Sequence, residues 1–486
     1  MYFAFINHFL VALIPLASIG VLAHLFLPEY SAYYAVFLTL WGVTFLVSWK
    51  RQEFSLAEMW RSKPESSSWK RPEFKSDQPS RQGIVAESYS FWKRWIVHVF
   101  LTGPIVLLFA GLVALASAAI LMMQVYTADF YNGPYKSVVS MTPVMVYVIS
   151  IPTLQSLYHT ITMKLTNLEN SRTQSSHTSS LTRKSFLLTL LITQLPLLLS
   201  ALVFIPFSDK LLPHLSTTPS LTETSNLLTP QSLRDRVIYF CMTGQVVNQA
   251  TEVLLPYLQS LYTSHTLKKK FSKQGIVNDE EDDSETIEQK IRKRVVKALS
   301  LPEYNLYDDY AELGNQFALI VMFSVVWPLA GVCFLVNNWM EVRTDAFKIC
   351  RAVRRPIPRE GRGIEPWFGI FWVVSVVGAV CTGWIVGVYG GEVNLEGAAS
   401  ERTLERIPRA LVGVFVAEHF HIIAWWLIEF VFGVVFGSGV ERELELHNSR
   451  RRNLQETIEQ LHKEEDGEED MDERVERVME LVSSVF

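Results

Sequence analysis

Residues 306–347 read LYDDYAELGNQFALIVMFSVVWPLAGVCFLVNNWMEVRTDAF, and this stretch decides the fold. Two apolar runs, each of helical length, flank a break at Trp327 and Pro328. About 24 Å of helical rise separates Glu312 from Pro328, and about 20 Å separates Pro328 from Glu341. We therefore expect a helical hairpin whose two ends return to nearly the same level.

The composition of the whole chain fits a membrane environment. Of its 486 residues, 49% are hydrophobic, 12% are aromatic and only 19% are charged. An average soluble domain carries about a quarter charged residues. The composition therefore argues against a soluble enzyme, a disordered protein and a nucleic-acid-binding protein. Together with the recurring apolar runs, it predicts an all-α polytopic membrane protein.

Ten membrane-spanning helices are predicted, with both termini in the cytosol. Four loops on one side contain 28 Lys and Arg residues, whereas the alternate loops contain 6, and positive charge favours the cytosolic side. Residues 1–440 form the transmembrane domain, and residues 441–486 form a charged cytosolic tail with a helical apolar pattern. The helices are predicted at 4–28, 32–48, 95–123, 138–160, 186–207, 236–262, 310–327, 329–349, 365–390 and 410–437.

Acidic and amide residues form three pairs inside the predicted helices. Ionisable residues in membrane spans are costly and usually mark function. Each pair is spaced three or four residues apart and so shares one helix face. The depths of the three pairs allow them to occupy one layer. The pairs are Asn248 with Glu252, Asp309 with Glu312, and Glu341 with Asp345.

An oxygen-only set of this kind suits Ca²⁺, and five negative charges nearly balance two such ions. Two alternatives remain open from the residues alone. The carboxylates could instead pair with Arg343 or Lys348 at the loop ends, or they could couple the transport of a substrate to protons or Na⁺.

At these residues the sequence resembles the anoctamin family, most closely its fungal-type branch. The resemblance extends from the first predicted helix to about residue 450, and the block over residues 307–358 is highly specific. The motifs that carry it are WKRQE (49–53), RPEF (71–74), LTNLENSRT (165–173), NQATEVLLP (248–256), YDDYAELGNQF (307–317) and NNWMEVRTDAFKICRAVRRPIP (337–358).

The resemblance implies a binding site for two Ca²⁺ ions per subunit. It also implies a homodimer formed through the tenth helix, a lipid-facing groove between the fourth and sixth helices, and residence in the plasma membrane or the endoplasmic reticulum. Members of the family carry a folded cytosolic domain before the first helix, and we expect no counterpart of it here. Either a truncated gene or a natural short form would explain this difference. The implied Ca²⁺ ligands are Asn248, Glu252, Asp309, Glu312, Glu341 and Asp345.

The family divides into Ca²⁺-activated phospholipid scramblases and Ca²⁺-activated chloride channels, and the groove helices favour scrambling. An anion pore needs fixed positive charge at depth, but the fourth and fifth helices lack Lys and Arg, and the sixth has Arg only near its outer end. Neutral polar side chains would lower the cost of moving a lipid headgroup. The chosen groove and gating residues are Thr142, Tyr147 and Thr153 in the fourth helix, and Tyr239, Thr243 and Gly244 in the sixth.

The predicted activity is passive transport without enzymatic catalysis, because the chain contains no nucleotide-binding GxxxxGK[ST] motif. Ca²⁺ binding to helices six to eight is expected to gate the groove, with Gly244 as a bend point or as a close packing contact. The expected partners are membrane phospholipids and a second copy of the chain, and nucleic acid is not expected. Three alternatives to scrambling are a chloride channel, a tether between endoplasmic reticulum and plasma membrane, and an ion-coupled transporter.

Overall fold

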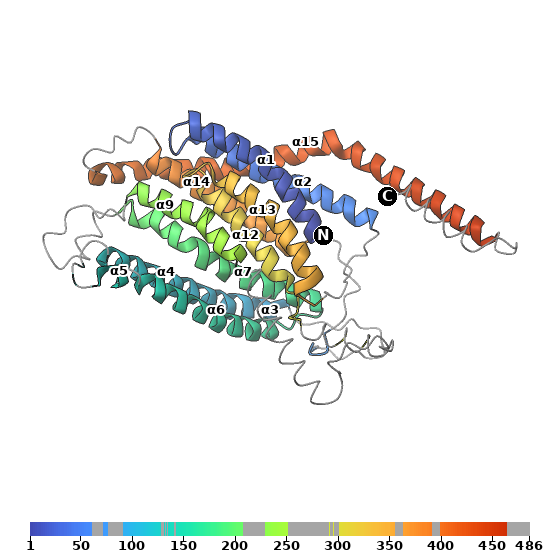
Figure 1. The fold of residues 1–486 in the computed structure, drawn as a ribbon, viewed down its shortest axis with the longest axis horizontal. Coiled ribbons are helices and arrows are strands. Elements are labelled where there is room, and N and C mark those ends of the chain that lie inside the picture. The colour runs from blue at the N-terminus through green and yellow to red at the C-terminus, as the bar shows by residue number, and fades with distance from the viewer. Residues whose placement is uncertain are drawn as a thin grey trace, which may run out of the picture.

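The computed structural model describes residues 1–60, 71–75, 91–127, 131, 133, 135–139, 142–207, 229–250, 291, 295, 301–354, 363–390 and 399–463. Over these ranges the chain is mainly helical and contains no β-strand, and an isolated β-bridge pairs Glu303 with Arg354. The helices lie side by side in one bundle, from which the end of the last helix projects (Figure 1).

The elements are α1 (Tyr2–Phe26), α2 (Ala32–Met59), α3 (Phe91–Ile96), a π-helical turn (Val97–Thr102), α4 (Gly103–Val125), α5 (Lys136–Val139), α6 (Thr142–Leu168), α7 (Gln174–Leu199), a second π-helical turn (Ser200–Phe204), α9 (Pro230–Cys241), α12 (Leu306–Phe323), α13 (Ala330–Phe347), a third π-helical turn (Lys348–Ala352), α14 (Trp367–Tyr389) and α15 (Ala399–Lys463).

Helical structure occupies each of the ten predicted ranges, as far as these ranges are described. Among the described residues, six stretches are long and apolar enough to cross a bilayer, so the chain is an integral multi-pass membrane protein. The ten spans and the orientation of the termini stay predictions. The six stretches are Tyr2–Phe26, Ala32–Met59, Val97–Gln124, Gln174–Phe204, Trp367–Tyr389 and Arg406–Val435.

The hairpin formed by α12 and α13 is less apolar than these six stretches because both helices carry charge. Each of the two contains three charged residues among its 18. Asn305 caps the start of α12, since its side chain accepts a hydrogen bond from the Tyr307 backbone nitrogen at 3.2 Å. Asp308 and Asp309 follow in the first turn, where acidic side chains complement the helix dipole.

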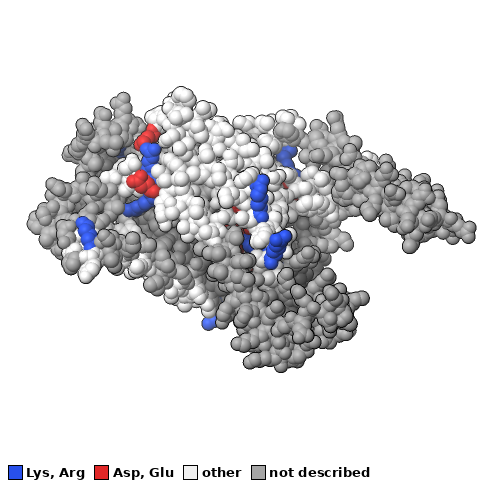
Figure 2. All heavy atoms as spheres, viewed as in Figure 1, with Lys and Arg blue, Asp and Glu red and all other residues white. Residues whose placement is uncertain are grey.

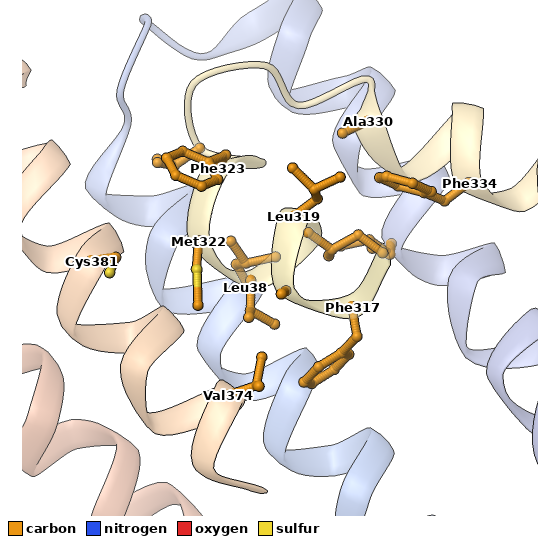
Figure 3. Packing of buried hydrophobic residues seen from close by; sticks show 14 of the residues in the cluster. Leu38, Phe317, Leu319, Met322, Phe323, Ala330, Phe334, Val374 and Cys381 are labelled. Atoms are coloured by element: carbon orange, nitrogen blue, oxygen red, sulfur yellow. The ribbon is translucent and has the colours of Figure 1, made fainter. Parts of the chain in front are cut away.

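The middle of α12 forms the centre of the hydrophobic core (Figure 3). Phe317 and Phe323 are fully buried, and they pack in one cluster with Leu38 of α2, Phe334 of α13 and Val374 of α14. The turn after α12 is tied to α2 as well, because the Tyr34 and Ser324 hydroxyls lie 2.9 Å apart. This packing fixes the hairpin, and with it the acidic pairs at its open end.

The contact between α14 and α15 depends on small residues. Gly383 and Gly387 of α14 face α15, and a Cβ atom added to Gly383 would lie 2.7 Å from the Gly413 carbonyl oxygen. A Cβ atom on Gly387 would collide with the backbone of Ala410. Small residues of this kind let two helix backbones approach closely inside a membrane.

The opposite face of α15 is apolar and exposed in the single chain. Seen from one side, the described surface shows a broad uncharged band between its visible charged groups (Figure 2). α15 is one continuous helix of 65 residues, and it crosses the predicted domain boundary at residues 440 and 441 without a break. Its exposed apolar side chains include Leu411, Phe415, Ile422, Ile423, Trp426 and Phe430.

A buried ion pair joins α6 to α7 within the LTNLENSRT stretch. The Lys184 ammonium contacts the carboxylate of Glu169, which also accepts a hydrogen bond from Ser180 at 2.6 Å. Lys184 is 8% exposed and Glu169 is 1% exposed. The side-chain amide of the neighbouring Asn170 accepts from the Lys75 backbone nitrogen at 3.0 Å and donates to the Lys75 carbonyl oxygen at 2.6 Å, which ties the described segment 71–75 to this turn.

The four cysteines are free thiols, as their scattered positions suggest. Cys241 and Cys381 are buried, and Cys333 is partly buried. Cys350 is exposed. It lies in the π-helical turn after α13, where the helix leaves the core.

Candidate functional site

The open end of the hairpin brings acidic residues of α12 and α13 together, as the spacing predicts. Asp309 is 2% exposed, Glu341 is 1% exposed and Asp345 is 2% exposed. Buried carboxylates need hydrogen bonds or compensating charge. Two cross-helix groups supply these contacts.

The first group joins Glu312 of α12 to Glu341 of α13 through the Gln316 amide. The Gln316 Nε2 atom donates to Glu312 Oε1 at 3.3 Å and to Glu341 Oε2 at 3.1 Å. Asn337 also donates to Glu341 Oε2, at 3.1 Å. Asn338 donates to Gln316 Oε1 at 2.8 Å, which orients the amide toward both carboxylates.

The second group joins Asp309 to Asp345 through the Lys348 ammonium. The Lys348 Nζ atom lies 2.7 Å from Asp309 Oδ1 and 3.0 Å from Asp345 Oδ1. The other oxygen of each carboxylate accepts from a phenol, since Tyr304 donates to Asp309 Oδ2 and Tyr2 donates to Asp345 Oδ2. Burial beside Asp309 raises the pKa of the Tyr304 phenol above its ordinary value, so this hydroxyl stays a donor.

Of the two cations that could pair with the carboxylates, one does so. Lys348 makes the contacts just described, whereas Arg343 lies over the Trp339 ring at 3.9 Å and donates to the Trp339 carbonyl oxygen at 2.7 Å. The described acidic groups therefore interact with one tethered ammonium and with neutral amides and phenols.

A cavity of about 680 Å³, which we call the inner cavity, opens beside this site. Its wall contains Asn248, Asp309, Glu312 and Lys348, so it brings the amide ligand predicted for the sixth helix to the two acidic ligands of α12. The amide oxygens of Gln194 and Gln245, which also line it, have no hydrogen-bond donor among the described residues. Uncharged polar residues from α6 and α7 complete the wall: Gln155, Thr189 and Thr193.

The predicted groove residues differ in what the structure shows of them. Tyr239, Thr243 and Thr153 are exposed, and Thr142 is partly buried. The Tyr147 side chain lies outside the described part of the chain. Tyr158 of α6 belongs to the core, because it packs edge-on against Phe109 and donates to the Lys184 carbonyl oxygen at 3.0 Å.

The sixth predicted helix is interrupted near the expected bend point. α9 ends at Cys241, Met242 has a distorted backbone at φ −108° and ψ −73°, and residues 243–250 are helical again. The break therefore lies at Met242, two residues before Gly244. Glu252 lies outside the described residues.

The donor chemistry of the site fits a hard cation such as Ca²⁺. The predicted ligands present only oxygen donors, and the unpaired amide oxygens of Gln194 and Gln245 add acceptors at the inner cavity. In the described part of the chain, however, no three acidic, His or Cys side chains converge to form a metal-binding group. The four described carboxylates form two cross-helix groups.

Several residues of the site escape prediction from the sequence. Gln316 follows Glu312 by four residues and Asn337 precedes Glu341 by four, so helical spacing could have placed both amides beside the acids. The phenols of Tyr2 and Tyr304 come from outside the hairpin, and their contacts follow only from the packing of α1 and of the segment before α12.

A bundle of apolar helices that buries acidic, amide and lysine side chains at one level defines an integral membrane protein with an internal polar site. A sequence model described as "Anoctamin: Calcium-activated chloride channel" matches residues 1–447, so the chain belongs to the anoctamin family. This family includes Ca²⁺-activated scramblases and chloride channels, and its members are generally dimeric.

Individual relatives agree with this assignment. The chain is 27% identical over 449 residues to the uncharacterized Schizosaccharomyces pombe protein C691.05c, which covers 90% of the chain and 65% of that protein. It is 26% identical over 404 residues to human anoctamin-10, covering 80% of the chain and 56% of the relative. For human anoctamin-7 the identity is 25% over 365 residues, covering 70% and 37%. The chain thus spans 65% or less of the length of these relatives.

Proposed function

We propose that this protein is a Ca²⁺-activated passive phospholipid scramblase with an accompanying non-selective ion conductance. The observation that carries this proposal is the inner cavity, whose wall combines uncharged polar residues of α6 and α7 with acidic residues of α12. The lipid pathway and the Ca²⁺ site that gates it would then line the same cavity.

Asn248, Glu252, Asp309, Glu312, Glu341 and Asp345 would hold two Ca²⁺ ions per subunit. The bound ions would supply positive charge that offsets the repulsion among the carboxylates. The Gln316 amide and the Asn337 amide orient Glu312 and Glu341 toward each other across the two helices. Binding by the sixth helix would gate the groove between the fourth and sixth helices, and the break at Met242 supplies a bend close to the predicted one at Gly244.

Neutral polar groups along the route support lipid movement. Thr153 and Gln155 of α6 are exposed, and Thr243 is exposed on the facing segment. Such groups replace part of the hydration of a headgroup while the acyl chains stay in hydrocarbon. Lys348 does not give the cavity a net positive charge, because its single ammonium sits between two carboxylates.

A chloride channel is the second candidate. The family description names this activity, and Lys348 lines the inner cavity. An anion pore would use fixed positive charge of this kind. The two activities are separable by measuring lipid movement and chloride flux on the same vesicles.

We further propose a homodimer through the tenth helix, in the plasma membrane or endoplasmic reticulum. The exposed apolar face of α15, which includes Leu411, Phe415 and Trp426, is the surface that such a dimer would cover. α14 binds the other side of the same helix through Gly383 and Gly387.

The test uses purified full-length chain in liposomes that contain a fluorescent lipid and an entrapped chloride indicator. Wild type is expected to move lipid faster when Ca²⁺ is added. Asp309→Asn should raise the Ca²⁺ concentration for half-maximal scrambling by about tenfold or more, which corresponds to about 1.4 kcal/mol. Glu252→Gln should have the same direction of effect. Asp308→Asn is the matched control, because Asp308 is exposed and accepts from Asn305 at 2.9 Å.

The outcomes separate the two parts of the proposal. Chloride flux without lipid movement would replace scrambling by the channel activity. Equal Ca²⁺ dependence in wild type, Asp309→Asn and Asp308→Asn would contradict the assigned Ca²⁺ site.

A further inference from the structure

The Lys348 ammonium lies between Asp309 and Asp345, two of the predicted Ca²⁺ ligands. Its Nζ atom lies 2.7 Å from Asp309 Oδ1 on α12 and 3.0 Å from Asp345 Oδ1 on α13, so one ammonium bridges the two helices. The side chain is 8% exposed, and both carboxylates are 2% exposed. This contact is therefore a buried ion-pair triad with two negative charges and one positive charge.

The remaining oxygens of the triad are also hydrogen-bonded. Tyr304 donates to Asp309 Oδ2, and Tyr2 of α1 donates to Asp345 Oδ2. Each carboxylate thus has a charged donor on one oxygen and a neutral donor on the other. All four carboxylate oxygens therefore accept hydrogen bonds from donors of the chain itself. The Lys348 ammonium takes the position between the two carboxylates that a bound cation would take.

We propose that Lys348 is a tethered competitor of Ca²⁺ for Asp309 and Asp345, and that its displacement sets the Ca²⁺ concentration at which the protein responds. The inference rests on the Ca²⁺ site of the proposed function. Oxygen atoms that accept from the ammonium are not available to a metal ion. The apparent affinity therefore equals the intrinsic affinity multiplied by the fraction of molecules in which Lys348 is away from the two carboxylates, and it falls as that fraction falls.

The surroundings of Lys348 allow such an exchange. Its four-carbon stem is flexible, and the side chain already lines the inner cavity of about 680 Å³. Glu303 lines the same cavity and offers another carboxylate to a displaced ammonium. The Lys348 Nζ atom also lies 6.0 Å from the centre of the Tyr304 ring, and Tyr304 lines the same cavity.

The test measures Ca²⁺ binding directly, by calorimetry on purified full-length protein in detergent, beside thermal melting in chelator and in Ca²⁺. Lys348→Met is expected to bind Ca²⁺ about tenfold more tightly than wild type, because no internal cation competes. In chelator its melting temperature should be lower than that of wild type, because two buried carboxylates lose their counter-charge. Addition of Ca²⁺ should raise its melting temperature more than it raises that of wild type. Lys348→Arg keeps the charge and should stay closer to wild type.

Arg343→Met is the matched control on the same helix. Arg343 stacks on Trp339 and donates to its carbonyl oxygen, and within the described part of the chain it contacts no carboxylate of the site. Its removal should change Ca²⁺ affinity by about twofold at most, through long-range charge alone. If Lys348→Met does not stay folded in chelator, it is purified in Ca²⁺ and its affinity is read from a titration with chelator.

Unchanged or weaker Ca²⁺ binding by Lys348→Met would overturn the inference, because the lysine would then support the site with the ion bound. An equal gain in Arg343→Met would also overturn it. Absence of Ca²⁺ binding by wild type would overturn both this inference and the Ca²⁺ site. Tight binding without lipid movement in liposomes would contradict only the proposed scrambling.

Discussion

The Gln316 amide nitrogen lies 3.1 Å from Glu341 Oε2, and this hydrogen bond connects the middle of α12 to the second half of α13. The same nitrogen reaches Glu312 at 3.3 Å. A neutral donor shared by two carboxylates keeps them close without neutralising them. The site is thereby held together while its negative charge remains available to a cation.

Gln316→Leu should lower the free energy of unfolding in chelator by about 1–3 kcal/mol, since two carboxylates lose a buried donor. At saturating Ca²⁺, the free energy of unfolding of Gln316→Leu should differ less from that of wild type. Chemical unfolding in detergent with and without Ca²⁺ measures both values. The control is Gln231→Leu, because Gln231 donates to Asp235 at the exposed surface of α9. An equal loss in the two variants would contradict the assigned role.

Tyr2→Phe removes the hydroxyl that donates to Asp345 from the first turn of α1. We expect a loss of about 1 kcal/mol in chelator, because the aromatic packing of Tyr2 on Tyr310 is kept while one hydrogen bond is lost. Tyr33→Phe is the control at a side chain that is 80% exposed. Identical melting curves for wild type and Tyr2→Phe would show that the contact contributes nothing to stability.

Lys184→Met should be among the most damaging single changes in the chain. It leaves the buried Glu169 carboxylate without its ammonium partner, which costs about 3–5 kcal/mol. The double variant Lys184→Met with Glu169→Gln should recover much of this loss, because the unpaired charge is gone. Lys164→Met, at an exposed position on α6, is the control. The free energies of unfolding of the four proteins form the test, and a double variant no better than the single one would argue against a charge effect.

Gly387→Leu should separate α14 from α15, because any Cβ atom at this position collides with Ala410. The expected cost is about 1–3 kcal/mol or more from overpacking. Gly369 lies on the same helix with no atom near its added Cβ, so Gly369→Leu should be tolerated. Size-exclusion profiles and melting curves compare the two. Equal behaviour would mean that the close approach is not required.

Much of the architecture could be predicted from the sequence because it follows from local patterns. The break at Trp327 and Pro328, together with the two apolar runs beside it, specifies the α12–α13 hairpin and the return of its ends to one level. The acidic residues at these ends are visible in the sequence for the same reason, since charge in an apolar run is rare and costly. All ten predicted ranges contain helix where they are described.

What escaped prediction depends on contacts between segments far apart in the chain. Tyr2 and Asp345 are 343 residues apart, and only the packing of α1 on α13 brings them together. The choice of Lys348 over Arg343 as the partner of the carboxylates depends on helix rotation, which places one cation toward α12 and the other against Trp339. The helix break at Met242 could not be predicted, because position 242 is neither Pro nor Gly.

The length of α15 has a mechanical consequence. A straight helix of 65 residues is about 98 Å long, whereas the hydrocarbon core of a bilayer is about 30 Å thick. The helix is therefore far longer than one bilayer crossing requires, and its free end projects from the bundle in Figure 1. If the helix turned as one body, a tilt of about 5° at the membrane would move a point about 40 Å beyond it through about 3.5 Å. The free end of α15 would thus amplify small rearrangements of the bundle.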